Sequence, residues 1–227
     1  MKNDQINIVH FSDLLCVWAY ISQIRIDELE ANFSAQVCMD YRFFPVFGDV
    51  AGKIAAQWSD KGGIKAYARH VQEVAGQFEH VEINPEAWLQ NTPASSLPAH
   101  LIACGTKVLI AQHPGRCHPD LMHNLLKHLR HAFFVDLADI SNQQTLLSIA
   151  DDSGIPVDML QQTLDNGTAH AQLAADLSAA TLSGIRSSPT LSFNEGRQML
   201  AGNVGYRVLE ANIRELLNNP ADQQSWC

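Results

Sequence analysis

The sequence has no long apolar run and few basic residues. No stretch approaches the roughly 20 apolar residues that span a bilayer, so we expect no membrane segment. Lys and Arg number 15 against 24 Asp and Glu, a formal net charge of −9. Proteins that bind the nucleic-acid backbone normally carry a basic surface. The charge balance therefore predicts a compact soluble protein that does not bind nucleic acid.

Cysteine is scarce and odd in number. Five cysteines cannot all pair within one chain, which excludes a fully paired secreted disulfide framework. Residues 1–7 contain no apolar run, so we expect no secretory signal. These features predict a reducing, cytoplasmic location, where a cysteine is free, metal-bound or catalytic more often than bridged.

The first 48 residues predict a strand, a helix and a second strand. β-branched and aromatic residues fill positions 6–11 and stop at a turn, Ser12-Asp13. Apolar residues then recur at helical spacing from Val17 to Leu29, and residues 36–44 again have strand character. A strand, helix and strand in this order form a βαβ unit with parallel strands.

The rest of the chain predicts a helical block followed by a hairpin and a last helix. Strand signals vanish between residues 49 and 183, a segment too long for a simple crossover. Residues 190–193 and 197–201 then predict a hairpin. Gly202-Asn203 is expected to open a helix that ends at residues 218–220, followed by a tail. The predicted plan is an α/β fold: βαβ, a helical insertion, then ββα.

Cys16 lies where the first predicted strand passes into the first predicted helix. Free N–H groups and the helix dipole stabilise an anion there. A thiol in that position can drop from a pKa of about 8.5 to roughly 3.5–7.5. We therefore expect Cys16 to be a thiolate at neutral pH; the alternative is a small buried cysteine that only packs.

Three segments resemble DsbA-like thioredoxin-fold proteins. Residues 11–20, Phe-Ser-Asp-Leu-Leu-Cys-Val-Trp-Ala-Tyr, resemble the family's active-site segment. Residues 184–190, Gly-Ile-Arg-Ser-Ser-Pro-Thr, resemble the loop that carries its cis-proline, and residues 131–141 are similar to its inserted helical domain. The resemblance implies a thioredoxin-like domain formed by residues 1–48 and 184–219. It also implies an inserted helical domain over 49–183, with 220–227 as a tail.

The same resemblance implies roles for single residues. Cys16 matches the family's nucleophile and Trp18 stands in the middle of its motif. Pro189 matches the cis-proline, and the Ser188 backbone is implied to hydrogen-bond an extended thiol-bearing substrate. The chain departs from the family at Ala19, where its oxidoreductases carry a second cysteine. A dithiol enzyme resolves mixed disulfides with that second thiol, so the departure predicts monothiol chemistry at Cys16.

A resolving thiol would then be external or distant. We expect Cys38 and Cys104 to be core residues and Cys117 to lie in a loop. Cys227, next to Trp226 in the tail, is the internal candidate, although a frayed terminus is the usual state of such a tail. No tightly bound cofactor is expected. Glutathione is the expected co-substrate, and glutathione or protein thiols and disulfides are the expected partners.

Two other functions stay open. The same resemblance extends to kappa-class glutathione transferases and 2-hydroxychromene-2-carboxylate isomerases, which act with glutathione on small molecules. Gly202 and Asn203 at the last helix N-terminus would then bind a glutathione carboxylate, although Asn203 also suits a helix cap. An aromatic small molecule would occupy a pocket under the insertion, lined by aromatic residues of the insertion. The same residues also suit an ordinary hydrophobic core; they are Trp58, Tyr67, Phe78 and Trp88. The third function is non-catalytic binding on a thioredoxin scaffold. Apolar surface on the insertion could also make a homodimer.

Histidines gather between His113 and His131. His113, Cys117 and His118 are metal-ligand types, but neither a Cys-x-x-Cys nor a His-Glu-x-x-His pattern occurs. His128 and His131 are three apart on a predicted helix and can also be solvated. We predict no metal site.

Overall fold

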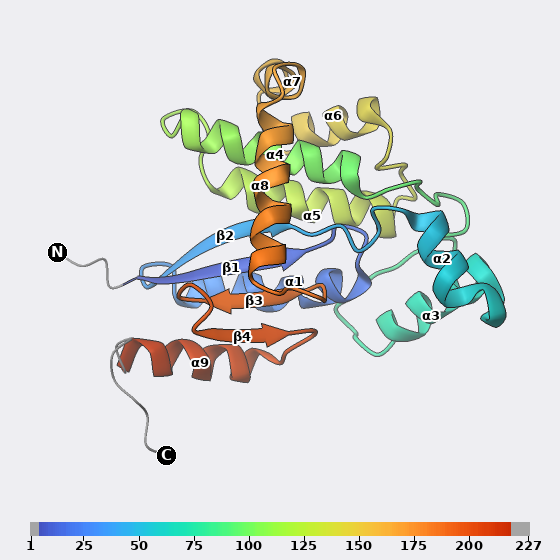
Figure 1. Cartoon of the computed structure of the whole chain (residues 1–227), viewed down its shortest axis with the longest axis horizontal. Helices are drawn as coiled ribbons and strands as arrows, with labels where there is room; N and C mark the ends of the chain where they lie inside the picture. Colours follow the sequence, from blue (N-terminus) through green and yellow to red (C-terminus); the bar gives the residue numbers. More distant parts are fainter. Residues whose placement is uncertain (1–4, 219–227) are drawn as a thin grey trace.

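A four-stranded sheet lies at the centre of the protein (Figure 1). The structure is a computed structural model that describes residues 5–218. Its strands are β1 (Ile6–Ser12), β2 (Val37–Phe43), β3 (Thr190–Phe193) and β4 (Gln198–Ala201). They lie in the order β2-β1-β3-β4. Trp226 and Cys227 fall outside the described residues.

The strand pairing confirms the predicted topology. β1 pairs in parallel with β2, so that Ile6 lies opposite Val37. β1 pairs antiparallel with β3, and β3 pairs antiparallel with β4. Asn194, Glu195 and Gly196 turn the β3–β4 hairpin with positive φ angles of 43°, 55° and 90°. The predicted βαβ unit and hairpin therefore share one sheet, with β1 in its interior.

The helices follow the predicted order. α1 (Val17–Asn32) connects β1 to β2, and α9 (Tyr206–Asn218) follows β4. The insertion between β2 and β3 contains α2 (Val50–Trp58), η1 (Ser59–Lys61), α3 (Gly63–Ala75), α4 (Leu97–Gln112), α5 (Asp120–Phe134), α6 (Gln143–Asp152), α7 (Val157–Asp165) and α8 (Thr168–Leu182). α4, α5 and α6 form a layer beyond β2, and α8 runs from that layer down to β3 (Figure 1). The exact domain boundaries stay predictions.

β1 is covered on both faces, which explains its apolar sequence. Ile6 and Ile8 join the main core, whereas Phe11 packs with Ala180 and Ile185 on the opposite face. Because successive side chains of a strand point to opposite faces, an interior strand buried on both sides is apolar nearly throughout. β1 thus holds its C-terminal end, where Cys16 follows, in a fixed place.

Two local predictions are wrong. The last helix begins at Tyr206, so Gly202 and Asn203 lie in the turn after β4 and not at a helix N-terminus. Cys38 is exposed on β2 and is not a core residue, because β2 is an edge strand whose even-numbered side chains are only partly covered. Cys104 is buried, as predicted, and Cys117 is a buried loop residue.

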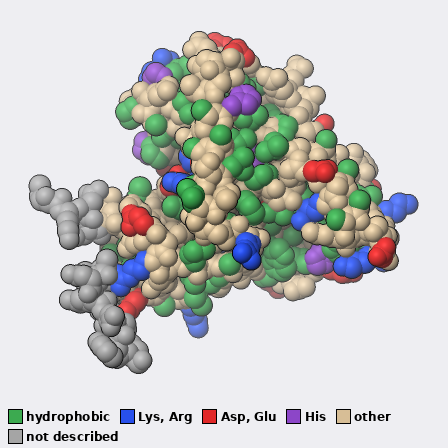
Figure 2. Space-filling view, viewed as in Figure 1, with side chains coloured by type: hydrophobic (Ala, Val, Ile, Leu, Met, Phe, Trp, Pro, Cys, Tyr) green, Lys and Arg blue, Asp and Glu red, His purple; other side chains and the backbone are tan. Residues whose placement is uncertain are grey.

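The surface agrees with an acidic composition. On the part of the face in Figure 2 that the structure describes, Lys and Arg side chains lie singly and form no continuous basic area. Among residues 5–218, no helix is both long enough and apolar enough to cross a bilayer.

Gly105 allows three helices of the insertion to approach closely. A Cβ atom at this position of α4 would lie 2.5 Å from Thr163 Oγ1 and 2.7 Å from Leu160 Cδ1, both on α7. It would also lie 3.6 Å from the Ala169 Cβ on α8. The Thr163 hydroxyl donates a hydrogen bond to the Leu160 carbonyl, which holds the crowded atom in place. Glycine is therefore needed here for packing.

We expect Gly105→Val to lower the free energy of unfolding by about 2 kcal/mol, because overpacking a filled core typically costs 1–3 kcal/mol. Gly115→Val is the matched control, since a Cβ there meets no atom within 4 Å. It should change stability by less than about 0.5 kcal/mol. Urea denaturation followed by circular dichroism measures both. Equal stabilities of the two variants would contradict the packing role of Gly105.

Candidate functional site

Cys16 is the N-cap residue of α1. Its backbone is extended, with φ −80° and ψ 115°, and its carbonyl accepts the Tyr20 N–H at 3.0 Å, the first bond of the helix. Its own N–H donates to the Asp13 carbonyl at 3.1 Å, which closes a tight turn after β1. The sulfur is therefore placed beside the free N–H groups of the first helical turn, as the sequence predicts.

The Cys16 thiol faces the loop before β3. Cys16 Sγ donates a hydrogen bond to the Ser188 carbonyl at 3.2 Å. The Ser188–Pro189 peptide bond is cis, as the resemblance implies. The Asp13 N–H donates to Ser188 Oγ at 2.9 Å, and the Gly202 N–H donates to the Pro189 carbonyl at 2.8 Å. Cys16, Ser188, Pro189 and Gly202 are thus brought together from separate parts of the sequence.

The protonation state of Cys16 differs from the sequence prediction. The side chain is only 6% exposed. Burial raises the pKa of the Cys16 thiol, and the negative charge of Asp13 raises it further. The Ser188 side chain and the N–H groups of Ala19 and Trp18 lower the pKa but do not offset burial. The prediction of a thiolate at neutral pH is therefore wrong: burial outweighs the helix N-terminus, and the resting group is a thiol.

Asp13 is a buried carboxylate that ties the chain after β2 and the start of α4 to the turn before Cys16. Its Oδ1 accepts the Leu15 N–H at 2.8 Å, while Oδ2 accepts the Phe47 N–H and the Ser96 hydroxyl, both at 2.8 Å. His100 Nε2 lies 3.6 Å from Oδ1. Burial alone would raise the pKa of Asp13, but His100 and the two N–H donors lower it below the usual range. Asp13 is therefore ionised at neutral pH.

Arg130 places a buried positive charge near this turn. The side chain is fully buried on α5 and donates hydrogen bonds to Gln23 Oε1 and, at 3.4 Å, to Ser12 Oγ. Its Nε has no partner among the described residues, and no carboxylate there forms an ion pair with it. Burial and the charge of Arg130 lower the pKa of His10 to about 3, so His10 is neutral. Burial also lowers the pKa of Arg130, whereas Cys16 and Asp13 are among the groups whose charges raise it.

Trp18 on α1 and Asn203 in the turn after β4 are linked through Arg25 and Phe78. Trp18 is half-buried and packs edge-on against Phe78 at 6.4 Å between ring centroids. Arg25 lies over the same Phe78 ring at 5.8 Å and donates a hydrogen bond to Asn203 Oδ1. The Asn203 side chain therefore accepts a hydrogen bond from α1 and does not lie at a helix N-terminus, contrary to the prediction.

Aromatic residues of the insertion pack close to Cys16. Phe47, Tyr67 and Trp88 contact one another with ring centroids 5.0–5.8 Å apart. Burial raises the pKa of Tyr67 well above its usual value, and the charges of Cys16 and Asp13 raise it further. Tyr67 and Trp88 are buried core residues, and Trp58 is partly buried. The effect of the Cys16 and Asp13 charges on Tyr67 places this aromatic cluster near the thiol site.

No other described cysteine can resolve a disulfide at Cys16. Cys38 lies opposite Asn7, at the other end of β1 from Cys16. Cys104 is buried 3.7 Å from Asp176, and burial and this charge raise the pKa of Cys104 above its usual range. Cys117 is buried in the loop between α4 and α5. Residues 5–218 contain no disulfide.

The histidines that lie close together in the sequence between His113 and His131 do not converge on one point in the structure. His118 pairs with Asp120, His128 with Ser153 and His131 with Asp136. Among the described residues, the one group of three or more metal-ligand side chains whose ligand atoms all lie within 4.8 Å of one another is Asp27, Glu30 and His123. Each nitrogen of His123 there faces one of the two carboxylates.

Sequence reasoning missed the residues that support Cys16 from a distance. The sequence marks Asp13 only as a turn residue, and it gives no reason to select Ser96, His100 or Arg130. A charged residue three positions before a reactive cysteine is a weak signal, but it is available in the sequence. The distant partners of Asp13 lie between positions 47 and 100, so no local pattern marks them.

We expect Asp13→Asn to lower the free energy of unfolding by about 2–3 kcal/mol, because it disrupts a buried charged acceptor of several hydrogen bonds. The same change should lower the pKa of Cys16, since it removes a negative charge that raises it. The stability difference should shrink as the pH falls through the Asp13 pKa, because the depressed pKa stabilises the fold only while the carboxylate is ionised.

Ultraviolet absorbance of the thiolate, in a background that carries Cys38→Ser and Cys227→Ser, measures the Cys16 pKa. Chemical denaturation across the acid range measures stability. An Asp13→Asn protein with an unchanged or higher Cys16 pKa would contradict the electrostatic role of Asp13, whatever its stability.

Comparison with known proteins shows which family and which solved structures this architecture matches. A family model described as a DSBA-like thioredoxin domain matches residues 7–214. A search of curated protein sequences found no significant match. Among solved structures, a putative protein disulfide isomerase from Nitrosomonas europaea has a TM-score of 0.74 at 16% identity, over 94% of this chain and 98% of that one.

Two further solved structures have the same fold. The cytosolic disulfide reductase DsbM from Pseudomonas aeruginosa has a TM-score of 0.65 at 15% identity, over 92% of this chain and 98% of its own. It was also solved with GSH. A 2-hydroxychromene-2-carboxylate isomerase has a TM-score of 0.60 at 13% identity, over 96% of this chain and all of its own. These identities establish the fold, and the family match establishes the lineage: the chain belongs to the DSBA-like thioredoxin domain family.

Proposed function

We propose that this protein exchanges thiols and disulfides through Cys16 alone, with glutathione as the external thiol that completes the cycle. One observation carries the proposal: the Cys16 thiol, at the start of α1, faces the Ser188 carbonyl at 3.2 Å, while position 19 is a fully buried alanine. The nucleophile of a thioredoxin-fold enzyme is in place, and the second thiol of its motif is absent.

The reaction proceeds in two balanced exchanges. The Cys16 thiol first loses its proton to solvent, and the thiolate attacks one sulfur of a substrate disulfide. A Cys16–substrate disulfide forms, and the other sulfur leaves as a thiolate. A glutathione thiolate then attacks the substrate sulfur of this mixed disulfide. Cys16 leaves as a thiolate, and the substrate carries the glutathionyl disulfide. Electrons are conserved, because each step breaks one S–S bond and forms another.

The Ser188 carbonyl has a different partner in each state. In the resting protein it accepts the Cys16 thiol proton. Once Cys16 is a thiolate or a mixed disulfide, that proton is gone and the carbonyl is free to accept an N–H from an extended substrate. Substrate binding and loss of the thiol proton therefore favour each other.

Burial of Cys16 sets the expected pH dependence. Only the thiolate attacks a disulfide, and burial keeps most of Cys16 protonated at neutral pH. A substrate that packs over the site also supplies hydrogen bonds that the thiolate lacks in the free protein. The buried Arg130 also interacts with this site, since a negative charge on Cys16 is among the charges that raise the pKa of Arg130.

The solved structures support the glutathione part of this proposal. DsbM, which shares the fold, is named a cytosolic disulfide reductase and was solved with GSH. A reducing cytoplasm would supply the thiol that the protein itself lacks next to Cys16. We therefore include a cytoplasmic location and the absence of a tightly bound cofactor in the proposal.

We expect oxidised glutathione to add one glutathionyl group to Cys16, and reduced glutathione to remove it. Cys16→Ser should abolish this rapid adduct, and Cys38→Ser, which removes an exposed cysteine, should leave it unchanged. The rate should rise with pH beyond neutrality, because the thiolate fraction rises there. Intact-protein mass spectrometry with peptide mapping measures the adduct.

Other results would select another function. Reversible binding of reduced glutathione without any adduct would contradict the exchange reaction and favour a glutathione-dependent transferase or isomerase. Neither binding nor adduct would favour the non-catalytic scaffold. If Cys227 is the resolving thiol, the adduct decays to a Cys16–Cys227 disulfide in the native protein and persists in Cys227→Ser.

Restoring a second thiol tests the role of position 19. We expect Ala19→Cys to form a disulfide between Cys16 and the new thiol, so that the glutathionyl adduct becomes short-lived and is released without added reduced glutathione. Ala19 is fully buried, and the added sulfur should cost about 1–3 kcal/mol of stability, which thermal unfolding measures. A folded Ala19→Cys protein whose adduct persists as in the native protein would show that a missing partner does not limit resolution.

A further inference from the structure

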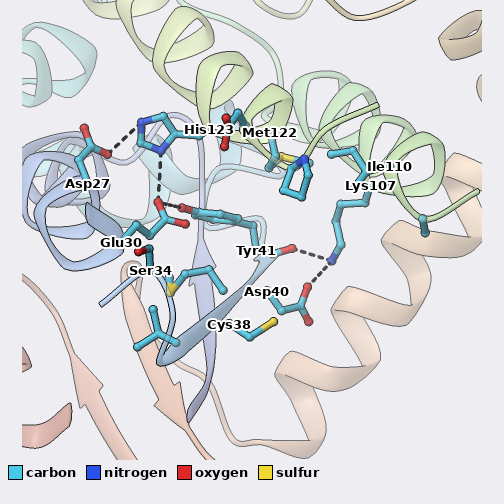
Figure 3. Close-up of a pocket in the computed structure, with 15 residues that line it drawn as sticks. Asp27, Glu30, Ser34, Cys38, Asp40, Tyr41, Lys107, Ile110, Met122 and His123 are labelled. Atoms are coloured by element: carbon cyan, nitrogen blue, oxygen red, sulfur yellow. Dashed lines mark hydrogen bonds and ion pairs between the residues drawn. The ribbon is translucent and has the colours of Figure 1, made fainter. Parts of the chain in front are cut away.

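A groove runs along the edge strand β2 (Figure 3). Five consecutive residues of β2, Val37 to Tyr41, form one side, and the end of α4 with the start of α5 forms the other. The hollow has a volume of about 740 Å³. We call it the β2 groove. Cys38 in the groove lies opposite Asn7, whereas Cys16 follows the other end of β1, so the groove is separate from the thiol site.

The backbone of β2 alternates between its two edges. The backbone N–H and C=O groups of even-numbered residues point towards β1. The Gln36 carbonyl accepts a hydrogen bond from the Ile6 N–H, and the Phe44 N–H donates one to the Ser12 carbonyl. The backbone groups of odd-numbered residues point away from β1. The Tyr41 carbonyl accepts a hydrogen bond from the Lys107 ammonium at 2.6 Å, and the Phe43 N–H donates one to the Asp176 carboxylate at 3.2 Å. Because N–H and C=O of one residue point to the same edge, the free edge belongs to odd-numbered residues.

Hydrogen bonds cap both ends of this free edge. At the N-terminal end the Val37 N–H donates to the Phe33 carbonyl at 2.9 Å. Lys107 and Asp176 occupy backbone groups of Tyr41 and Phe43. Met39 is the next odd-numbered residue, and among residues 5–218 neither its N–H nor its C=O has a hydrogen-bond partner beyond the sheet. An uncapped edge next to a hollow is a template for another strand. Met39 and its neighbours thus offer a short run of backbone hydrogen bonds to an incoming chain.

The groove is acidic on both faces of the sheet. Glu30 and Asp27 stand on α1, below one face, and Asp40 stands on β2 itself, pointing towards the other (Figure 3). Asp120 at the start of α5 adds a fourth carboxylate, 81% exposed. Part of this charge is already paired: Lys107 contacts Asp40 and Asp176, Arg42 contacts Asp40 at 2.7 Å, and Lys127 contacts Asp27 at 2.9 Å. Glu30 and Asp120 pair with no lysine or arginine among residues 5–218. A chain in the groove would therefore meet carboxylates whichever way its side chains alternate.

The floor of the groove is apolar. Met39, Ile110 and Met122 line it, and the two methionines have flexible side chains that adapt to different partners. Lys and Arg side chains suit such a surface, since their aliphatic stems pack on apolar groups while the charged ends reach carboxylates. The chain's formal net charge of −9 adds long-range attraction for a basic partner.

We propose that the β2 groove binds an extended, lysine- or arginine-bearing peptide segment, which adds to the sheet as a strand beside β2. Backbone hydrogen bonds to Met39 provide the register, and the carboxylates on both faces select basic side chains. The site does not depend on Cys16 or on its proposed reaction.

The probe is a fluorescein-labelled, end-blocked heptapeptide of alternating valine and lysine, measured by fluorescence anisotropy at low salt. Its matched control carries glutamate at each lysine position. We expect the lysine peptide to bind, the glutamate peptide not to bind, and added salt to weaken binding.

Met39→Pro tests the backbone contact, because it removes an N–H that faces the free edge and no N–H that faces β1. Proline is tolerated in an edge strand at such a position. We expect it to weaken binding about tenfold, whereas Met39→Leu, which keeps the N–H, should change it less than about twofold. Asp120→Lys, an exposed change that leaves the fold intact, should also weaken the lysine peptide. Circular dichroism checks that Met39→Pro is folded.

Three results would overturn the proposal. One is failure of the lysine peptide to bind the native protein. Another is equal binding by Met39→Pro, Asp120→Lys and the native protein. The third is a native dimer, seen by sedimentation, that Met39→Pro dissociates while the lysine peptide has no effect, since the groove would then be a contact between two copies of this chain.

Discussion

Buried Asp13 holds together the parts of the protein that make the Cys16 site. Its two oxygens accept hydrogen bonds from the turn itself, from the chain after β2 and from the start of α4. These partners belong to both the sheet and the insertion, so the carboxylate fixes where the helical insertion meets the C-terminal end of β1. Loss of one partner would leave a buried charge underbonded, which costs far more than a surface contact. The position of Cys16 therefore depends on a residue that does no chemistry.

The same carboxylate opposes the chemistry that it positions. Burial and Asp13 both raise the pKa of Cys16, while the Ser188 side chain and the helix N–H groups lower it. Arg130, buried and without an ion-pair partner among the described residues, supplies a charge of the opposite sign. The resting protein thus carries a buried, protonated thiol at this position.

The sequence predicts the fold well because its signals are local. β1, the β3–β4 hairpin and the helical block follow from residue periodicity, and Cys16 and Pro189 stand in short recognisable segments. Predictions failed where tertiary context decides. Cys38 has a strand neighbourhood that suits a core, but β2 lies at an edge and leaves it exposed. Asn203 has the chemistry of a helix cap, yet Arg25 from α1 occupies it. The helix dipole predicts a thiolate at Cys16, but the depth of burial cannot be obtained from spacing.

The missing cysteine at position 19 changes what the surrounding structure must do. A dithiol enzyme releases its substrate by an internal attack across one helical turn, so its site needs room for one partner only. Here Ala19 is fully buried, and in the proposed reaction an external thiol must reach the mixed disulfide. Cys38 cannot supply this thiol because the length of β1 separates it from Cys16.

The same separation leaves β2 free to bind a partner at its edge without obstructing exchange at Cys16. A basic segment held at Met39 would raise the local concentration of its own chain near the thiol site, provided its linker spans the sheet. The two ends of one parallel strand pair can therefore serve recognition and reaction separately.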